Sequence, residues 1–307
     1  MIRSRSAVTF ILVAGLSACT PFMGGNAGSR TTAAITAGEL RTRLEIFSDD
    51  SMLGRGVGTI GNRKGTQYIA DEFRKMGLEP AGDSGTYFQD IHPAPTARLD
   101  LTKTVPGGAR NVVAILRGSD PALRNTFVAI GAHNDAIGIV TPRDPDSVRA
   151  VNLLVEKLKN QVERMPTAAE RDSIRSVVAA SRVRPAVTRI DSIVNGADDD
   201  GSGTVGLLEI AETFAKSGTR PRRSVLFVSH TGEEAGLLGS RWFTDHPTVE
   251  RDSIVAQINI DMIGRGGAAD IRGGGPDYLQ LIGARRLSTE LGTIIDRVNS
   301  ERTRPFV

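Results

Sequence analysis

The chain has 307 residues, of which 24% are charged and 39% are hydrophobic. That composition is typical of a soluble globular protein with one large or two small domains, and it excludes a disordered chain. Lys and Arg number 38 against 35 Asp and Glu, an excess of only +3 despite a pI of 9.2. We therefore do not expect nucleic-acid binding, which needs a concentrated basic surface. A single cysteine excludes an internal disulfide.

The N-terminus has the pattern of an export signal. Two arginines precede an apolar run over 7–16, which is too short to span a bilayer. The run ends in Leu16-Ser17-Ala18-Cys19, which resembles a bacterial lipobox, whose cysteine becomes the acylated first residue of a lipoprotein. The alternative is a plain secretory leader in which Cys19 is incidental. We expect a signal peptide over 1–18, a flexible tether over 19–34, and an exported protein held at the membrane, in the periplasm or at the outer membrane, by a lipid on Cys19.

From residue 35 the pattern becomes that of an α/β domain, which we expect to occupy 35–307. Short apolar, β-branched runs between turn residues predict buried strands, and apolar residues at helical spacing predict helices between them. Alternating strands and helices indicate a mixed central sheet with helices on both faces. The predicted strands are 112–116, 127–130, 224–228 and 254–260, and the predicted helices are 64–76 and 205–214.

One stretch interrupts this alternation. Residues 146–164 carry apolar side chains on one helical face, and a capping-box pattern at Thr167 and Glu170 opens a second helix that runs to about 182. We interpret the stretch about 142–192 as an inserted helical hairpin. It is either a lid or flank of a substrate cleft or a surface elaboration without function.

Two polar clusters stand in the first part of this pattern. His133 and Asp135 follow the strand 127–130 directly, and a metal-binding imidazole normally donates its second N–H to a carboxylate. Asp198-Asp199-Asp200 lies between glycines before the helix 205–214, and adjacent carboxylates repel one another unless a cation or solvent relieves them. The alternative for this second cluster is a solvated acidic turn at the start of a helix.

Two more clusters follow later strands. Glu233 and Glu234 come after the strand 224–228, and vicinal glutamates can divide the work of holding a metal and accepting a proton from metal-bound water. Asp261 stands at the end of the strand 254–260. We expect His230, which precedes the glycine turn, to be structural. Each signal is modest alone, because a strand-terminal acid or histidine is commonly a cap or a turn residue.

Together the clusters resemble the two-zinc exopeptidases of metallopeptidase family twenty-eight. The motifs H-x-D, D-D-D-G-S-G, G-E-E-A-G-L-L-G-S and N-I-D-M-I-G occur here in that family's order and spacing. The resemblance begins near Leu53-Gly54-Arg55-Gly56 and passes through Gly77-Leu78-Glu79-Pro80-Ala81-Gly82. The family includes secreted bacterial leucyl aminopeptidases, glutamate carboxypeptidases and glutaminyl cyclases. The resemblance implies a zinc-exopeptidase fold and a peptide substrate.

Carried over position by position, the resemblance also implies a ligand set. His133 and Asp261 bind one zinc ion, and Asp135 stands behind His133. Asp199 bridges the two ions, and the peptide that joins it to Asp200 is often cis in the family. Mixed nitrogen and oxygen ligands suit zinc.

The two glutamates complete the implied site. Glu233 is the general base, and Glu234 binds the other zinc ion. Two metal ions roughly 3.5–4 Å apart can hold a hydroxide and polarise the scissile carbonyl together.

The chain departs from the family pattern at its end. The family has a fifth ligand, a histidine from an S-D-H type loop well after the N-x-D-M strand. The histidines here are His92, His133, His230 and His246, so none follows Asp261, and the chain stops at Val307. We expect a truncated member or a fragment, in which one zinc position is incomplete; His246 is an alternative ligand.

Zinc-dependent aminopeptidase activity on peptides is the leading hypothesis for the function. One alternative is a lipid-anchored, non-catalytic member with an incomplete metal site. The other is carboxypeptidase or glutaminyl cyclase chemistry on the same fold, since these activities share the metal ligands.

Overall fold

The computed structural model describes residues 32–92, 104–143, 191–264, 275 and 277–306, together with 169, 172 and 176. Residues 32–307 form one compact unit. The predicted signal peptide, Cys19 and nearly all of the tether lie outside the described residues, as does almost all of the predicted helical insertion. No helix among the described residues has the length and apolar character that a membrane span needs.

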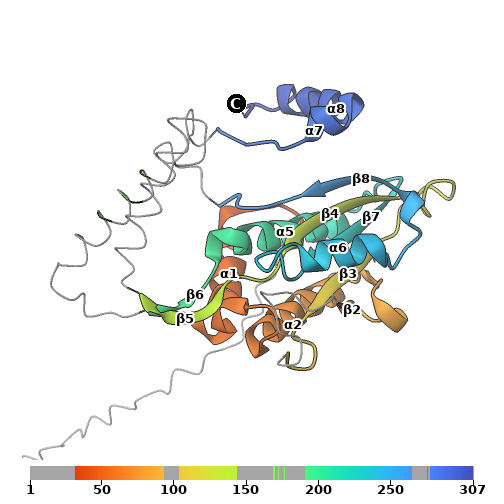
Figure 1. Cartoon of the computed structure of the whole chain (residues 1–307). Coiled ribbons are helices and arrows are strands. Elements are labelled where there is room, and N and C mark those ends of the chain that lie inside the picture. Colours follow the sequence, from red (N-terminus) through yellow and green to blue (C-terminus); the bar gives the residue numbers. More distant parts are fainter. Residues whose placement is uncertain are drawn as a thin grey trace, which may run out of the picture. The chain divides into compact units, whose positions relative to one another are not determined.

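A six-stranded mixed sheet forms the centre of this unit (Figure 1). Its order is β1-β3-β7-β4-β8, and β2 also pairs with β3. β3 runs antiparallel to β7, whereas β7, β4 and β8 are parallel to one another. The strands are β1 (Glu79–Pro80), β2 (Phe88–Asp90), β3 (Arg110–Leu116), β4 (Phe127–His133), β7 (Ser224–His230) and β8 (Ile254–Asn259).

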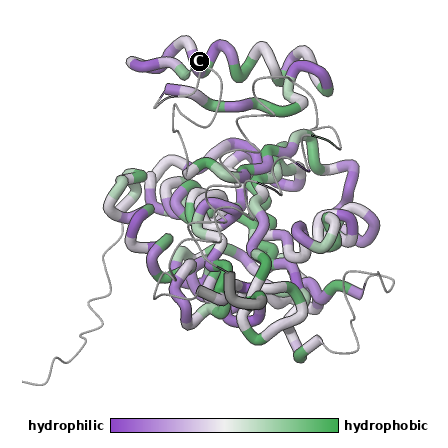
Figure 2. Tube along the Cα trace, turned by 60° about the vertical axis from the view of Figure 1, so that its left-hand side comes forward, coloured by the Kyte–Doolittle hydropathy of each residue, from purple (hydrophilic) through white to green (hydrophobic). Residues whose placement is uncertain are grey.

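Helices cover both faces of the sheet, as the sequence predicts. On one face, α1 (Ala37–Phe47), α2 (Ile60–Lys75) and α5 (Gly203–Lys216) share an apolar core with alternate residues of β3, β4 and β7. On the other face, Phe243 of α6 (Leu238–Asp245) packs on the intervening strand residues. Figure 2 shows hydrophobic stretches of the chain running through the middle of the body. The mixed sheet with helices on both faces is therefore confirmed.

The helix predicted over 64–76 begins one turn earlier, at Ile60. Thr59 caps it, because its hydroxyl accepts a hydrogen bond from the Gly61 amide at 3.2 Å. The first turn, Ile60 to Arg63, is short of apolar residues, so hydrophobic periodicity gave no signal there. The start of α2 is thus set by its cap.

A second, two-stranded sheet was not predicted. β5 (Gly138–Arg143) pairs antiparallel with β6 (Asp191–Val194). These strands lead into and out of the stretch that we interpret as an insertion, so its two ends are held together at a β-ladder. Near the other end of the chain, α7 (Ala284–Leu287) and α8 (Thr289–Ser300) pack against each other, and α8 carries both polar and apolar residues (Figure 2).

Candidate metal centre

The carboxyl ends of β4, β7 and β8 lie at one edge of the sheet, because these strands are parallel. Open α/β sheets place their binding sites at this edge. β4 ends at His133, β7 runs into the loop that carries Glu233 and Glu234, and β8 runs into Asp261. The topology therefore brings together three of the four clusters that the sequence predicts.

His133 is the centre of the group. Its Nδ1 lies 3.5 Å from a carboxylate oxygen of Asp135, and its Nε2 lies 3.1 Å from Oδ1 of Asp199. Burial alone would lower the pKa of His133, but hydrogen bonds to Asp135 and Asp199 and the charge of Asp200 outweigh it and raise the pKa to about 11. The residue is 2% exposed, and Nε2 is the ring nitrogen that faces the carboxylates of Asp199, Glu233 and Asp261, so Nε2 is the nitrogen available to a metal. Nδ1 also lies 3.2 Å from the backbone carbonyl of Asp135, so Asp135 orients the imidazole through both its main chain and its carboxylate.

Asp135 connects two loops. Its side chain is fully buried, and its two carboxylate oxygens accept hydrogen bonds from the backbone amides of Glu233 at 3.1 Å and Glu234 at 3.3 Å. It therefore stands behind His133, as the resemblance implies. It also fixes the start of the glutamate loop relative to the imidazole.

The acidic turn supplies two carboxylates with different surroundings. The peptide between Asp199 and Asp200 is cis. Asp200 is fully buried, and its carboxylate accepts hydrogen bonds from the backbone amides of His133 (3.0 Å), Gly203 (2.9 Å) and Met262 (3.2 Å). The Asp199 side chain is 44% exposed and faces Nε2 of His133. Of the two, Asp199 is the better metal ligand, because the oxygens of Asp200 are occupied by amides.

Asp261 and Glu233 face the same imidazole. Oδ1 of Asp261 and Oε2 of Glu233 each lie 4.0 Å from Nε2 of His133. Ligand atoms of His133, Asp200 and Asp261 lie within 4.8 Å of one another, a spacing that could hold one ion. Since Asp200 already accepts three amides, we assign it to the support of this cluster. Sequence reasoning gave Asp200 no role, because its partners are backbone amides that no motif reveals.

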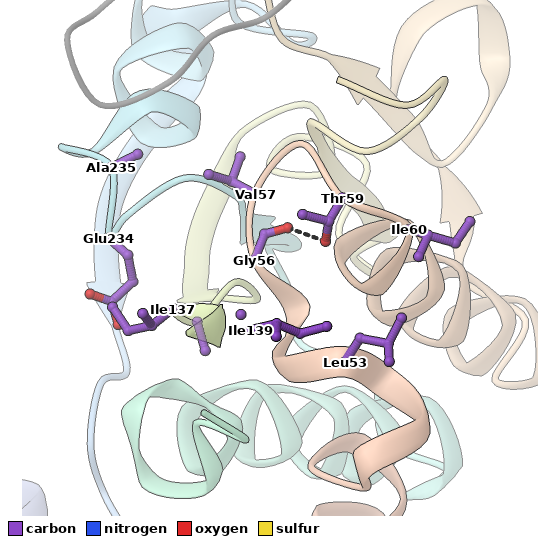
Figure 3. A pocket seen from close by; sticks show the side chains of 11 residues that line it. Leu53, Gly56, Val57, Thr59, Ile60, Ile137, Ile139, Glu234 and Ala235 are labelled. Carbon is purple, nitrogen blue, oxygen red and sulfur yellow. Dashed lines mark hydrogen bonds between the residues drawn. The ribbon is translucent and has the colours of Figure 1, made fainter. Parts of the chain in front are cut away.

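Glu234 lies on the wall of a neighbouring pocket. Figure 3 shows its side chain at one end of this pocket, which has a volume of about 410 Å³. The rest of the wall is largely apolar and comes from the loop before α2, the start of α2, and β5 with the residues just before it. The apolar side chains are Leu53, Val57, Ile60, Ala136, Ile137, Ile139 and Ala235.

In the described part of the chain, the negative charges of the carboxylates in the cluster are not balanced by nearby positive charges. Burial, with the charge of Asp261, raises the pKa of Asp200 to about 8. Burial, with the charges of Asp199 and Asp135, raises the pKa of Glu234 to about 7. Burial likewise raises the pKa values of Glu233 and Asp261. A bound cation would reverse these shifts, so one nitrogen and several oxygen donors around a cation-deficient cluster fit zinc.

The other described histidines lie in different surroundings. His230 is buried next to Phe243, with ring centroids 6.1 Å apart. His246 stacks on Trp242 at a centroid distance of 3.9 Å, and Trp242 also contacts His92 edge-on. Within the described residues, none of these three joins the group that could hold a metal.

The chain is similar in sequence to known proteins. The sequence profile of peptidase family M28 matches residues 111–286. Mouse aminopeptidase NAALADL1 is 48% identical over 77 residues, which cover 24% of this chain and 10% of the mouse protein. Leupeptin-inactivating enzyme 1 of Streptomyces exfoliatus is 35% identical over 80 residues, covering 25% of this chain and 18% of the enzyme. The match thus spans less than a fifth of each of these relatives.

Solved structures share the fold. A glutaminyl cyclase of Bacteroides thetaiotaomicron aligns with a TM-score of 0.54 and 14% identity, covering 90% of this chain and 77% of that one. A Zn-dependent exopeptidase of Parabacteroides distasonis aligns with a TM-score of 0.50 and 16% identity, covering 86% and 70%. At these identities the likeness concerns the fold alone.

Proposed function

Because the chain belongs to peptidase family M28, we propose that it is a zinc-dependent exopeptidase, specifically an aminopeptidase that removes N-terminal residues from peptides. The observation that carries the proposal is the cluster around Nε2 of His133, with Asp199 at 3.1 Å and with Asp261 and Glu233 each at 4.0 Å. His133, Asp199 and Asp261 would hold one zinc ion, and Glu234 with Asp199 would hold a second.

The protein's own groups have separable tasks. Zinc, when bound, polarises the scissile carbonyl and lowers the pKa of water. Glu233 takes the proton of the attacking water and returns it to the leaving amine. Its backbone amide donates to Asp135, which holds Glu233 beside the metal ligands.

Similarity to mouse aminopeptidase NAALADL1 supports an aminopeptidase over a carboxypeptidase. The pocket beside Glu234 supports a preference for an aliphatic side chain, because its lining is mostly apolar.

Hydrolysis of leucyl-4-nitroanilide by the zinc-loaded protein tests the activity, with N-acetyl-leucyl-4-nitroanilide as the blocked control. Glu233→Gln should keep zinc content and lower kcat by roughly a hundred to ten thousand fold, the usual value of a positioned general base. Glu250→Gln, at an exposed position, is the matched control and should leave kcat unchanged. Zinc binding without turnover of either substrate would instead favour the non-catalytic alternative.

The pocket is tested by comparing leucyl and alanyl substrates. Ile137, which is 51% exposed on the pocket wall, is changed to serine. Losing this apolar contact should lower kcat/KM for the leucyl substrate by about tenfold more than for the alanyl one. The control is Ile46→Ser, a 46% exposed isoleucine of α1 away from the pocket lining. An equal decrease in kcat/KM for both substrates would show that the pocket does not recognise the substrate side chain.

A further inference from the structure

Arg55 is a cation buried beside the metal centre. It ends the helical turn Asp50–Arg55, and its side chain is 0% exposed. Burial lowers the pKa of Arg55 to about 10, so the guanidinium keeps its charge at neutral pH. It lies over the Phe47 ring, 4.2 Å from the centroid. Burying a charge is costly unless the group is fully hydrogen-bonded, so its partners explain why it is there.

Those partners are main-chain oxygens from three separate segments. Nε donates to the Asn134 carbonyl at 3.0 Å, and Nη2 donates to the Gly196 carbonyl at 2.8 Å. Nη1 donates to the carbonyls of Asn195 and Phe47, each at 2.7 Å. A planar guanidinium can span several acceptors in fixed directions, which an ammonium cannot do.

Two of these segments carry proposed zinc ligands. Asn134 lies between His133 and Asp135, and Gly196 opens the turn that leads to Asp199. Gly196 has φ +57°, and a Cβ there would come within 3.0 Å of Nη2 and within 2.4 Å of the Ala136 Cβ. The positive φ and the contact with Ala136 therefore require a glycine at the point where the acidic turn approaches Arg55.

We propose that Arg55 is a positioning residue of the metal centre: it ties the His133 loop to the acidic turn through their backbone carbonyls. We call this set of hydrogen bonds from Arg55 the clamp. The clamp fixes the distance between the imidazole of His133 and the Asp199 carboxylate before zinc binds. Zinc binding then loses less conformational entropy, because the two loops are already ordered. This inference rests on the proposed function only in taking zinc as the ion.

Arg55→Lys tests the clamp, because lysine keeps the charge and loses the planar fork. Zinc affinity, measured by competition with a chromogenic chelator, should fall by about ten to a hundred fold, as for loss of other supporting partners of a ligand. The matched control is Arg43→Lys. Arg43 is also buried, but its partners are Glu72, Glu209 and Glu212, which lie outside the metal centre. This variant should lower Tm and leave zinc affinity within about twofold. If Arg55→Lys lowers Tm in the same way and keeps zinc affinity, Arg55 is merely structural and the proposal is overturned.

A measurement on the unmutated protein covers the case in which Arg55→Lys does not fold. Zinc should slow hydrogen exchange of the Arg55 Nε–H, followed by NMR of side-chain guanidinium groups, because metal binding disfavours opening of the clamp. Equal exchange rates with and without zinc would overturn the proposal. Both readouts are independent of turnover. If the clamp proves to support zinc binding but the protein hydrolyses no peptide, only the proposed function is contradicted.

Discussion

Two histidines end neighbouring parallel strands and pair in register, yet their surroundings are opposite. His133 closes β4 and His230 closes β7. Asp135 and Asp199 hydrogen-bond the first and raise its pKa to about 11. Burial, with the positive charge of His133 nearby, lowers the pKa of His230 to about 4. Among the described residues, neither ring nitrogen of His230 has a hydrogen-bond partner.

The difference arises from what lies beside each strand end. Just after His133, Asp135 reaches the ring, and Asp199, in the acidic turn before α5, faces it from the other side. His230 instead fits against Phe243 and over Gly131, where an added Cβ would lie 3.2 Å from its Nε2. The carboxylates around His133 thus make it a candidate metal ligand. His230, at the end of the neighbouring strand, is an uncharged core side chain.

The largest expected effect is on zinc binding. His133→Ala should weaken zinc affinity by more than about a hundredfold, the upper end of what loss of a supporting partner costs. His230→Phe should leave zinc affinity unchanged within about twofold, because that ring contributes no donor. Chelator competition on both variants checks the contrast. Comparable losses in the two would make His230 a ligand and reverse the assignment.

A smaller effect should follow from removing the carboxylate behind His133. Asp135→Asn keeps the shape of the side chain, but it removes the negative charge 3.5 Å from Nδ1 and weakens the hydrogen bonds from the amides of Glu233 and Glu234. Zinc affinity should fall by about ten to a hundred fold. The control is Asp120→Asn, an acid whose partners are Arg222 and the Ala122 amide. An unchanged zinc affinity in Asp135→Asn would show that His133 needs no orienting carboxylate.

The strands around this site and its candidate ligands can be predicted from the sequence. The residues that hold those ligands in position cannot. Buried runs such as 224–228 predict strands because apolar, β-branched residues between turns have few other uses. His133, Glu233, Glu234 and Asp261 can be predicted because they are polar residues that follow buried strands, and Asp199 because it lies among adjacent acids between glycines. Arg55 and Asp200 acquire their roles from backbone groups distant in sequence. Arg55 and Gly196 are 141 residues apart, and no local pattern encodes that contact. The β5–β6 ladder is missed for the same reason.

The smallest expected effect concerns acid stability and belongs to His230. Its folded pKa of about 4 lies below the ordinary value of 6.5, so below pH 6.5 the unfolded chain binds a proton that the folded protein does not. The free energy of unfolding must therefore fall as pH drops from 6.5 towards 4.

His230→Phe removes this linkage and should flatten the acid side of the stability profile. At pH 5.5 the histidine costs the wild-type protein about 1 kcal/mol relative to pH 7.5. Urea unfolding of the metal-free protein gives the free energy of unfolding at these two pH values. Its decrease from pH 7.5 to pH 5.5 should be smaller by that amount in His230→Phe than in the wild type. The comparison uses the change with pH within each protein, so a constant gain or loss from repacking the ring beside Phe243 cancels. His92 and His246 are present in both proteins and cancel as well. An identical acid loss in both would mean that His230 is protonated in the folded state, and the contrast with His133 would then be one of metal binding alone.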